Sequence, residues 1–317
     1  MTQFLTGKKV TAFAGGVGGS RLARGMAEHL TPEQFTIIVN TGDDFEQFGL
    51  KVSPDLDTML YNLSDVAQPD KGWGIHNDTS QVMTAVGKLG GATWFHLGDR
   101  DLATHLIRTQ LMLEGYTLTQ VAQYLCDQME VPFAVLPMAD EACRTMMETE
   151  QGVMDFQTYF VREQWQPALI GIHWQGNAQP TPQVMDAIHS ADVIVFCPSN
   201  PFVSIAPILH LPGVSEALAG KPVVAMSPII GGMAVKGPAA KMFQELTGEP
   251  ASVQAVVDYY GDLLTGFVVD EIDAVLLPEL QPKVPHVTAM PSLMLNRKKQ
   301  IEVAAAFLRF VQTMLEE

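Results

Sequence analysis

The segment that decides the fold is Lys9–Leu30, with the sequence KVTAFAGGVGGSRLARGMAEHL. Its first part, Lys9–Ala14, has the apolar and β-branched composition of a buried strand. The glycines of Gly15–Gly19 predict a loop, and Ser20–Leu30 predicts a helix because its apolar residues recur at the spacing of one helical face. A strand that passes through glycines into a helix indicates the first unit of a parallel α/β sheet.

The glycine-rich turn also predicts a contact with phosphate. Glycines allow close approach of the backbone, and the helix that follows offers free N–H groups and the positive end of its dipole. The turn lacks the dinucleotide fingerprint, because Arg21 stands where the third glycine would fall. It is not a Walker A loop either, since no Gly-Lys-Ser/Thr follows. The alternative interpretation is an ordinary tight turn.

Strand-like and helical patterns alternate along most of the chain. Further strands are expected at 35–39, 92–97, 131–136, 168–174, 193–196 and 223–226. Helices are expected after Ser53-Pro54 and over 102–114, 117–128 and 294–315, and a β-rich excursion over 143–161. This order predicts an α/β fold with a doubly wound, mostly parallel, Rossmann-like sheet and an inserted helical or β subdomain. We expect a single domain over 1–317, with room for an inserted helical subdomain at about 89–139.

Composition narrows the class of protein. The 317 residues are 47% hydrophobic and 17% charged, which is typical of a globular chain. A net charge of −16 argues against non-specific nucleic-acid binding. Three widely spaced cysteines without a CxxC pair argue against a zinc site and favour a reducing compartment, so we expect a cytoplasmic protein. No apolar run approaches the roughly 20 residues of a membrane span.

A cluster of acids follows the predicted strand at 35–39. The segment Asn40–Tyr61, NTGDDFEQFGLKVSPDLDTMLY, carries five of them: Asp43, Asp44, Glu46, Asp55 and Asp57. Ligands bind at the carboxyl edge of an α/β sheet, and clustered carboxylates repel one another without a cation. The segment therefore predicts either a Mg²⁺ site or a base tuned by its neighbours.

The five acids divide by position. Asp55 and Asp57 are two residues apart on the expected helix and point apart, so Asp44 and Asp57 make the better metal pair. Asp43 is a third candidate ligand. Asp55 is interpreted equally well as a charge that complements the helix dipole, and Glu46 as a solvent-facing residue.

Other polar turns are expected at the same edge of the sheet. The turn Gly98–Asp101 offers Arg100 as a contact for an anion or ring, or else only caps a helix. His105 is as consistent with a structural hydrogen bond as with catalysis. The loops Cys197–Phe202 and Ser227–Gly232 follow two further strands, and Lys236 precedes another helix. Convergence of these turns, not any one motif, predicts a nucleotide site.

Over nearly its whole length the sequence resembles the 2-phospho-L-lactate transferase family of coenzyme F-420 biosynthesis. The resemblance lies in GGVGGSRLA (15–23), NTGDDFEQFGLKVSPDLDT (40–58), WGIHND (73–78), LGDRDLATH (97–105), CPSNPFVSIAPIL (197–209) and SPIIGGMAVKGPA (227–239). Several long motifs in one order are specific, whereas a lone glycine loop is not.

The resemblance implies a reaction. The primary hydroxyl of the deazaflavin Fo attacks a guanosine diphosphate donor that carries 2-phospholactate or, in relatives from some bacteria, phosphoenolpyruvate, and GMP leaves. It implies Mg²⁺ and suggests a homodimer that binds small molecules, with no nucleic acid or membrane. Asp44 and Asp57 are the implied catalytic residues.

The resemblance also assigns contacts to residues of this sequence. The implied Fo contacts are Asp57, Arg100, Trp73 and His76, and Asp57 is also placed to orient or deprotonate the hydroxyl. The implied nucleotide contacts are Gly16, Gly18, Gly19, Ser20, Ser199 and Asn200. The implied metal ligands are Asp44, Asp57 and Asp43.

Two other functions fit parts of the sequence. One is a nucleotide-sugar-binding regulator of the same fold without turnover, which would share the glycine-rich turn. The other is an NAD(P)-dependent oxidoreductase with Asp43 or Asp44 on a ribose, against which the absent third glycine counts.

Overall fold

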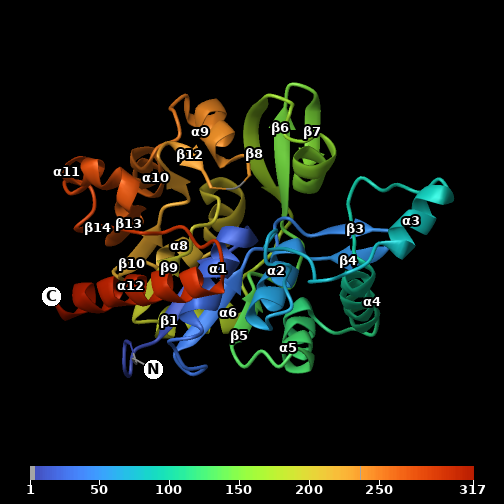
Figure 1. The fold of residues 1–317 in the computed structure, drawn as a ribbon, viewed down its shortest axis with the longest axis horizontal. Helices are drawn as coiled ribbons and strands as arrows, with labels where there is room; N and C mark the ends of the chain where they lie inside the picture. Colours follow the sequence, from blue (N-terminus) through green and yellow to red (C-terminus); the bar gives the residue numbers. More distant parts are fainter. Residues whose placement is uncertain (1–3, 236) are drawn as a thin grey trace.

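Seven parallel strands form the central sheet of the computed structural model, which describes residues 4–235 and 237–317 (Figure 1). The strands are β1 (Val10–Ala14), β2 (Phe35–Val39), β5 (Ala134–Pro137), β9 (Val193–Phe196), β10 (Val223–Met226), β13 (Gly266–Asp270) and β14 (His286–Met290). Their order is β14-β13-β10-β9-β1-β2-β5, and every neighbouring pair is parallel. The prediction of a doubly wound, Rossmann-like sheet is confirmed.

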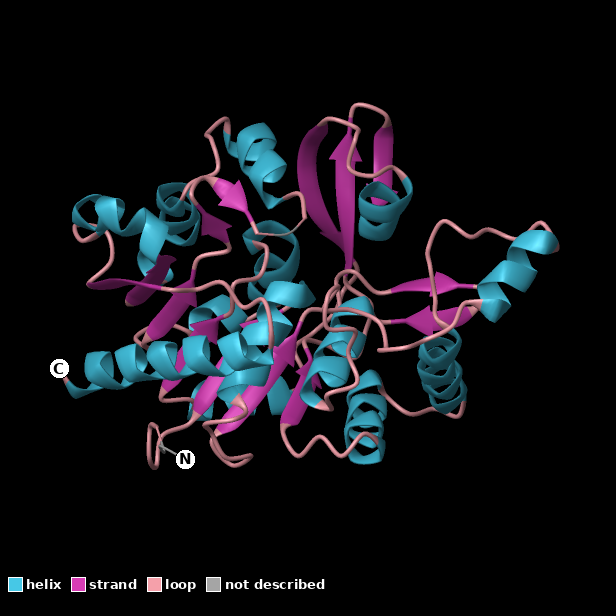
Figure 2. Ribbon diagram, in the orientation of Figure 1, coloured by secondary structure: helices cyan, strands magenta, loops and turns pink. Residues whose placement is uncertain are grey.

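Helices cover both faces of this sheet because successive strand residues point to opposite sides. Ala12 and Ala14 of β1 belong to a core with helices on one face: α1 (Gly16–Met26), α2 (Pro54–Leu63), α5 (Leu118–Gln128) and α12 (Arg297–Glu316). Phe13 points to the other face and stacks on Phe196, with ring centroids 5.4 Å apart. Helices of that face are α6 (Pro182–Ser190), α7 (Ala206–His210), α8 (Val214–Ala217) and α10 (Val253–Tyr260). The result is the three-layer arrangement in Figure 2.

The direction of chain progression reverses between β1 and β9. From β1 the chain adds β2 and β5 on one side, then returns to add β9, β10, β13 and β14 on the other. At such a switch point the loops after the two strands diverge and leave a crevice at their carboxyl ends, which is where open α/β sheets bind ligands.

Two additions extend beyond the three layers. The hairpin of β3 (Phe45–Gln47) and β4 (Leu50–Val52) projects to the right in Figure 1 with α3 (Gln81–Lys88), above α4 (Asp99–Leu113). A second antiparallel sheet, at the top, contains β6 (Arg144–Thr149), β7 (Gly152–Asp155) and β8 (Leu169–Gln175). The β-rich excursion expected at 143–161 is thus confirmed.

Short elements complete the chain. They are η1 (Thr158–Arg162), η2 (Pro201–Ile205), β11 (Ile229–Ile230), β12 (Met233–Ala234), α9 (Ala239–Thr247), η3 (Gly261–Leu263), η4 (Glu271–Leu276) and α11 (Leu277–Leu280). Among the described residues, no helix has the length and apolar character needed to cross a bilayer.

Some expectations about the elements were wrong. Residues 92–97 form no strand and run irregularly between α3 and α4. Their apolar side chains pack in a small separate core instead: Leu97 joins Val52, Met83 and Leu102, and Phe95 lies edge-on to Phe45. The strand expected at 168–174 exists as β8, but it belongs to the antiparallel sheet rather than the central one.

The first helix begins earlier than expected, at Gly16 rather than Ser20, so most of the predicted glycine loop is its first turn. The strands β13 and β14 were not predicted. A helical subdomain at 89–139 stays a prediction; within that range α4 and α5 contact each other, and α5 also packs on β5.

Candidate active site

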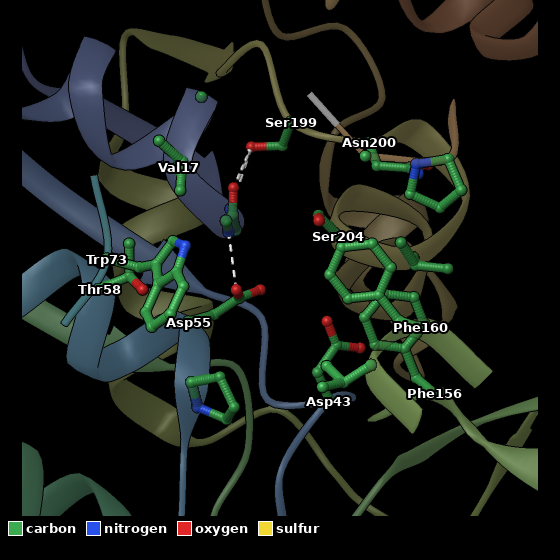
Figure 3. A pocket seen from close by; sticks show the side chains of 18 of the residues that line it. Val17, Asp43, Asp55, Thr58, Trp73, Phe156, Phe160, Ser199, Asn200 and Ser204 are labelled. Atoms are coloured by element: carbon green, nitrogen blue, oxygen red, sulfur yellow. Dashed lines mark hydrogen bonds between the residues drawn. The ribbon is translucent and has the colours of Figure 1, made fainter. Parts of the chain in front are cut away.

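A cavity of about 850 Å³ opens at the carboxyl ends of β1 and β9 (Figure 3). Its wall comes from the start of α1, the start of α2, the irregular segment before α4, the segment around η1, and the loops after β9, β10 and β14. The sheet topology thus brings together residues as distant in sequence as Gly15 and Met294 at the predicted edge.

The glycines of α1 allow that helix to start against the loop after β9. The backbone N–H of Gly15 donates to Ser199 Oγ at 3.1 Å, and the same hydroxyl lies 2.8 Å from the Gly15 carbonyl oxygen. A Cβ atom on Gly18 would lie only 2.2 Å from the carbonyl oxygen of Pro198. Close packing therefore requires glycine here, and it brings the start of α1 to the cavity wall.

The buried Asp43 and Asp55 and the half-buried Asp44 form what we call the acid cluster. Asp55 lies against the start of α1: its Oδ1 accepts from the Gly16 N–H at 2.8 Å and its Oδ2 from Asn40 at 2.9 Å. Asp44 Oδ2 accepts from the Ser53 hydroxyl at 2.6 Å. Oδ1 of Asp43 and of Asp44 are buried without a hydrogen-bond partner in the described part of the chain.

The electrostatics of the acid cluster favour a cation. Burial raises the pKa of Asp43 well above its ordinary value, and the charges of Asp55 and Asp44 raise it further. Burial likewise raises the pKa of Asp44, and it raises that of Asp55 to about 6. Buried oxygens without donors, in carboxylates that repel one another, are the donor set that fits a hard cation such as Mg²⁺.

A second polar group, which we call the Arg108 network, contains Asp57, Tyr61, Asp101, His105 and Arg108. The Arg108 side chain is only 1% exposed and contacts both carboxylate oxygens of Asp57, with Nη1 3.1 Å from Oδ2 and Nη2 on Oδ1. Its Nη1 also lies 3.1 Å from His105 Nδ1. His105 Nε2 lies 3.4 Å from Asp101 Oδ1, and the Tyr61 hydroxyl is 2.7 Å from that oxygen.

The Arg108 network differs from the acid cluster because it contains its own cation. Asp57, Asp101 and His105 offer atoms that lie within 4.8 Å of one another, as metal ligands do. However, both Asp57 oxygens already receive the guanidinium. Burial would lower the pKa of Arg108, but the Asp57 charge outweighs burial and raises it, so the guanidinium stays charged. The acid cluster therefore contains no positive charge, whereas in the Arg108 network the charge of Asp57 is already neutralised by Arg108.

Aromatic rings flank the cavity on two sides. Figure 3 shows Trp73 beside Asp55 and Thr58, and Phe156 with Phe160 on the opposite side near Asp43. Phe156 and Phe160 stack with centroids 5.3 Å apart and planes 11° apart. Walls of this kind suit flat heteroaromatic rings.

The structure brings many of the predicted site residues to the cavity. Those that line it are Gly16, Gly18, Asp43, Asp57, Trp73, Ser199 and Asn200. Gly19 and Ser20 are buried in α1, and Asp44 is half-buried; these three do not line the cavity. His76 and Arg100 are exposed and contact each other through the His76 carbonyl oxygen, 3.0 Å from Arg100 Nη1. Lys236 lies outside the described residues.

Sequence reasoning missed Arg108 and gave Asp101 only a capping role. Asp101 belongs to the Gly98–Asp101 turn, but Arg108 belongs to no glycine-rich or acidic motif. A signal was nevertheless present: Asp101, His105 and Arg108 follow one another at i, i+4 and i+7, which places three polar groups on one face of α4. All three are at least partly buried, which a solvated helix face would not require.

Comparisons with known proteins agree in family and fold. The family described as "2-phospho-L-lactate transferase CofD" matches residues 10–303. A phosphoenolpyruvate transferase of Streptomyces griseus is 40% identical over 319 residues, covering 98% of this chain and 99% of that protein. A 2-phospho-L-lactate transferase of Methanosarcina mazei is 38% identical over 294 residues, covering 92% and 97%.

A solved structure shares the fold. A UPF0052 family protein of Bacillus halodurans superposes with a TM-score of 0.61 at 16% identity, covering 94% of this chain and 99% of that one. At this identity the likeness concerns the fold alone.

Proposed function

The chain belongs to the 2-phospho-L-lactate transferase CofD family, and we propose that it uses the cavity at the β1/β9 edge to act on the deazaflavin Fo. Family and relatives make it a phospholactyl or phosphoenolpyruvyl transferase of coenzyme F-420 biosynthesis. The proposal adds the acceptor, Fo, and the donor, a guanosine diphosphate ester of phospholactate or phosphoenolpyruvate. The observation that carries it is the meeting of a helix N-terminus and buried acids in one large cavity.

In this proposal the donor lies across the switch point. The start of α1, with Gly16 and Gly18, and the loop with Ser199 and Asn200 face the diphosphate, because N–H groups at a helix start attract anions. The Gly16 N–H already donates to Asp55, so Gly16 contributes close approach of the backbone. Gly19 and Ser20 act from behind by allowing the helix to pack closely. The donor phosphorus is then presented to the other side of the cavity, where Fo binds.

The acid cluster supplies the metal site of the proposal. Asp43 and Asp44 would hold Mg²⁺ through their buried, unpartnered oxygens. When bound, the ion neutralises negative charge on the diphosphate. Asp57, the third ligand predicted from the sequence, has both oxygens on Arg108 and faces the acceptor in this account.

On the acceptor side, Asp57 and Trp73 line the cavity, whereas Arg100 and His76 stand at the surface nearby. We assign all four to Fo: Trp73 against its ring system, Asp57 near its hydroxyl, and Arg100 and His76 at the outer end. We also propose a cytoplasmic homodimer that binds these small molecules, with no nucleic acid or membrane.

The decisive assay incubates the protein with Fo, either guanylyl donor and Mg²⁺, and measures GMP. Release of GMP in proportion to Fo consumed is expected. Stoichiometric binding without GMP release would instead support the nucleotide-sugar-binding regulator. Thermal stabilisation by NAD(P)H, but not by GDP or Fo, would support the oxidoreductase.

A further inference from the structure

The direction of the hydrogen bonds in the Arg108 network follows from the chemistry of its members. A guanidinium only donates, so Arg108 Nη1, at 3.1 Å, makes His105 Nδ1 an acceptor. The neutral imidazole then carries its proton on Nε2. Nε2 lies 3.4 Å from Asp101 Oδ1 and makes no hydrogen bond within the described part of the chain. Arg108 therefore fixes the position of His105 and places its Nε2 beside Asp101.

The donors around Asp101 converge on one of its two oxygens. Oδ1 lies 2.7 Å from the Tyr61 hydroxyl, in addition to the contact with His105. Among the described residues none donates a hydrogen bond to Oδ2, and Asp101 lines the cavity. Burial raises the pKa of Asp101, but His105, Tyr61 and Arg108 together lower it below its ordinary value. An ionised carboxylate thus presents one occupied and one available oxygen.

Asp57 is less suited to accept a proton. Both of its oxygens accept from the Arg108 guanidinium. Nη1 lies 3.1 Å from Oδ2, and Nη2 contacts Oδ1. A proton on Asp57 would have to displace one of these charge-assisted hydrogen bonds in a buried site, which is costly. Asp101, next to it in the cavity wall, has no such constraint at Oδ2.

We propose that Asp101 is a catalytic residue that accepts the proton of the attacking acceptor hydroxyl at Oδ2, with His105 and Arg108 as positioning residues behind it. This inference rests on the proposed function. The hydroxyl O–H bond breaks and its oxygen forms a bond to the donor phosphorus. The bond from phosphorus to GMP breaks, GMP leaves with the electron pair, and Asp101 passes the proton to solvent.

The first test replaces Asp101 by asparagine, which keeps the shape but removes the proton acceptor. We expect Asp101→Asn to lower kcat for GMP release by roughly 100-fold or more, as loss of a general base does. KM for the guanylyl donor should stay within about twofold, because the donor contacts the other wall. The matched control is Asp99→Asn, in the same turn of α4. Asp99 is half-buried, accepts from the backbone of α3 and does not line the cavity.

The second test addresses positioning and does not depend on Asp101 variants being folded. Tyr61→Phe removes only the hydroxyl that donates to Asp101 Oδ1. Without that donor the pKa of Asp101 rises, so the acidic limb of the kcat–pH profile should move upward by about one unit. The other charged groups near Asp101, namely Asp57, His105, Arg108 and Asp78, whose Oδ2 accepts from the Asp101 backbone N–H at 3.0 Å, are unchanged in this variant. A merely structural role for Tyr61 would lower stability without moving the profile.

The outcomes separate this inference from the function on which it rests. A large kcat loss in Asp101→Asn, with Fo binding retained in isothermal titration and Asp99→Asn unaffected, supports it. If Asp101→Asn keeps kcat within twofold, or the profile of Tyr61→Phe does not move, Asp101 is not the proton acceptor and the transferase stands. A wild-type protein that binds Fo and donor yet releases no GMP overturns both.

Discussion

At the scale of single residues, the most consequential feature is a charge that cannot reach water. Arg108 is 1% exposed and compensates Asp57, whose side chain is 6% exposed. Removing one partner of a buried ion pair leaves the other unpaired, which is far more costly than losing a surface pair. The pair therefore links the stability of α2 and α4 to the geometry of the cavity wall.

We predict that Arg108→Met lowers the free energy of unfolding by about 3–5 kcal/mol, because Asp57 remains buried without its cation. Urea denaturation followed by circular dichroism measures the change. The control is Arg162→Met, which breaks the exposed pair with Glu163 and should cost less than about 1 kcal/mol. Similar losses in the two variants would show that the buried pair is not specially stabilising.

The sequence could predict the acids of this site better than their partners. Asp43, Asp55 and Asp57 stand in one motif after a strand, and all three line the cavity. Arg108 stands more than fifty residues from Asp57, and only the packing of α4 against the rest of the site brings them together. A stripe of polar residues along a helix indicates a buried functional site only when the structure shows that these residues are buried.

The acid cluster predicts a dependence of stability on pH when metal is removed. The pKa of Asp55 is raised in the fold to about 6, from an unfolded value of about 3.9. Protonated Asp55 stabilises the fold fully at pH values below its pKa in the unfolded state. This stabilisation is lost as the pH rises through its pKa in the folded state. In EDTA, wild type should lose on the order of 3 kcal/mol relative to Asp55→Asn between pH 4 and about pH 7.

Addition of Mg²⁺ should restore more stability at pH 7.5 than at pH 5, because the metal binds the ionised acids. Urea unfolding at both pH values, with and without Mg²⁺, measures the effect. Equal effects of Mg²⁺ at the two pH values, or none, would argue against a metal at Asp43 and Asp44. The same titration with the variant Asp43→Asn should show a weaker response.

At the scale of elements, the junction of α1 with the loop after β9 forms the cavity wall to which we assign the donor. A Cβ atom on Gly18 would meet the Pro198 carbonyl at 2.2 Å, so Gly18→Ala must push the helix start away from the loop. We expect a loss of about 1–3 kcal/mol in stability, typical of overpacking, and a raised KM for the donor. Thermal unfolding and initial-rate kinetics measure the two effects.

The control for Gly18→Ala is the same substitution in α3. A Cβ atom on Gly87 would lie 3.4 Å from Thr93 Cγ2, an ordinary contact. Gly87→Ala should therefore raise stability by about 0.5–1 kcal/mol, because alanine loses less backbone entropy in a helix. If both variants behave alike, close packing of α1 does not explain its glycines.

The elements that sequence patterns predicted well are those whose burial is uniform. The strands β9 and β10 are apolar at every position and buried on both faces, and they were predicted with the observed bounds. Residues 92–97 have a similar apolar run, but their partners are Phe45 and the small core near α4 rather than a sheet edge. Only Leu97 of residues 92–97 is buried, whereas β9 and β10 are buried at every position, and a short apolar run in the sequence does not distinguish these two environments.

At the scale of the whole molecule, the order of strands decides where the chemistry takes place. Reversal of the chain between β1 and β9 opens one crevice, and the loops of both halves supply its walls. Alternation of strands and helices in the sequence predicted this class of sheet. It placed the turn Gly98–Asp101 at this edge only as the end of a strand that does not form, and it did not place η1 there, because η1 belongs to an addition outside the alternating pattern.

The central claim is that this crevice is the active site of a transferase that joins Fo to the three-carbon acid phosphate of a guanylyl donor. The most direct measurement is mass spectrometry of the products formed from Fo, Mg²⁺ and each candidate donor. We predict a phosphodiester of Fo with phospholactate or phosphoenolpyruvate, accompanied by one equivalent of GMP. Recovery of unchanged Fo and intact donor, from a folded protein that binds both, would contradict the claim.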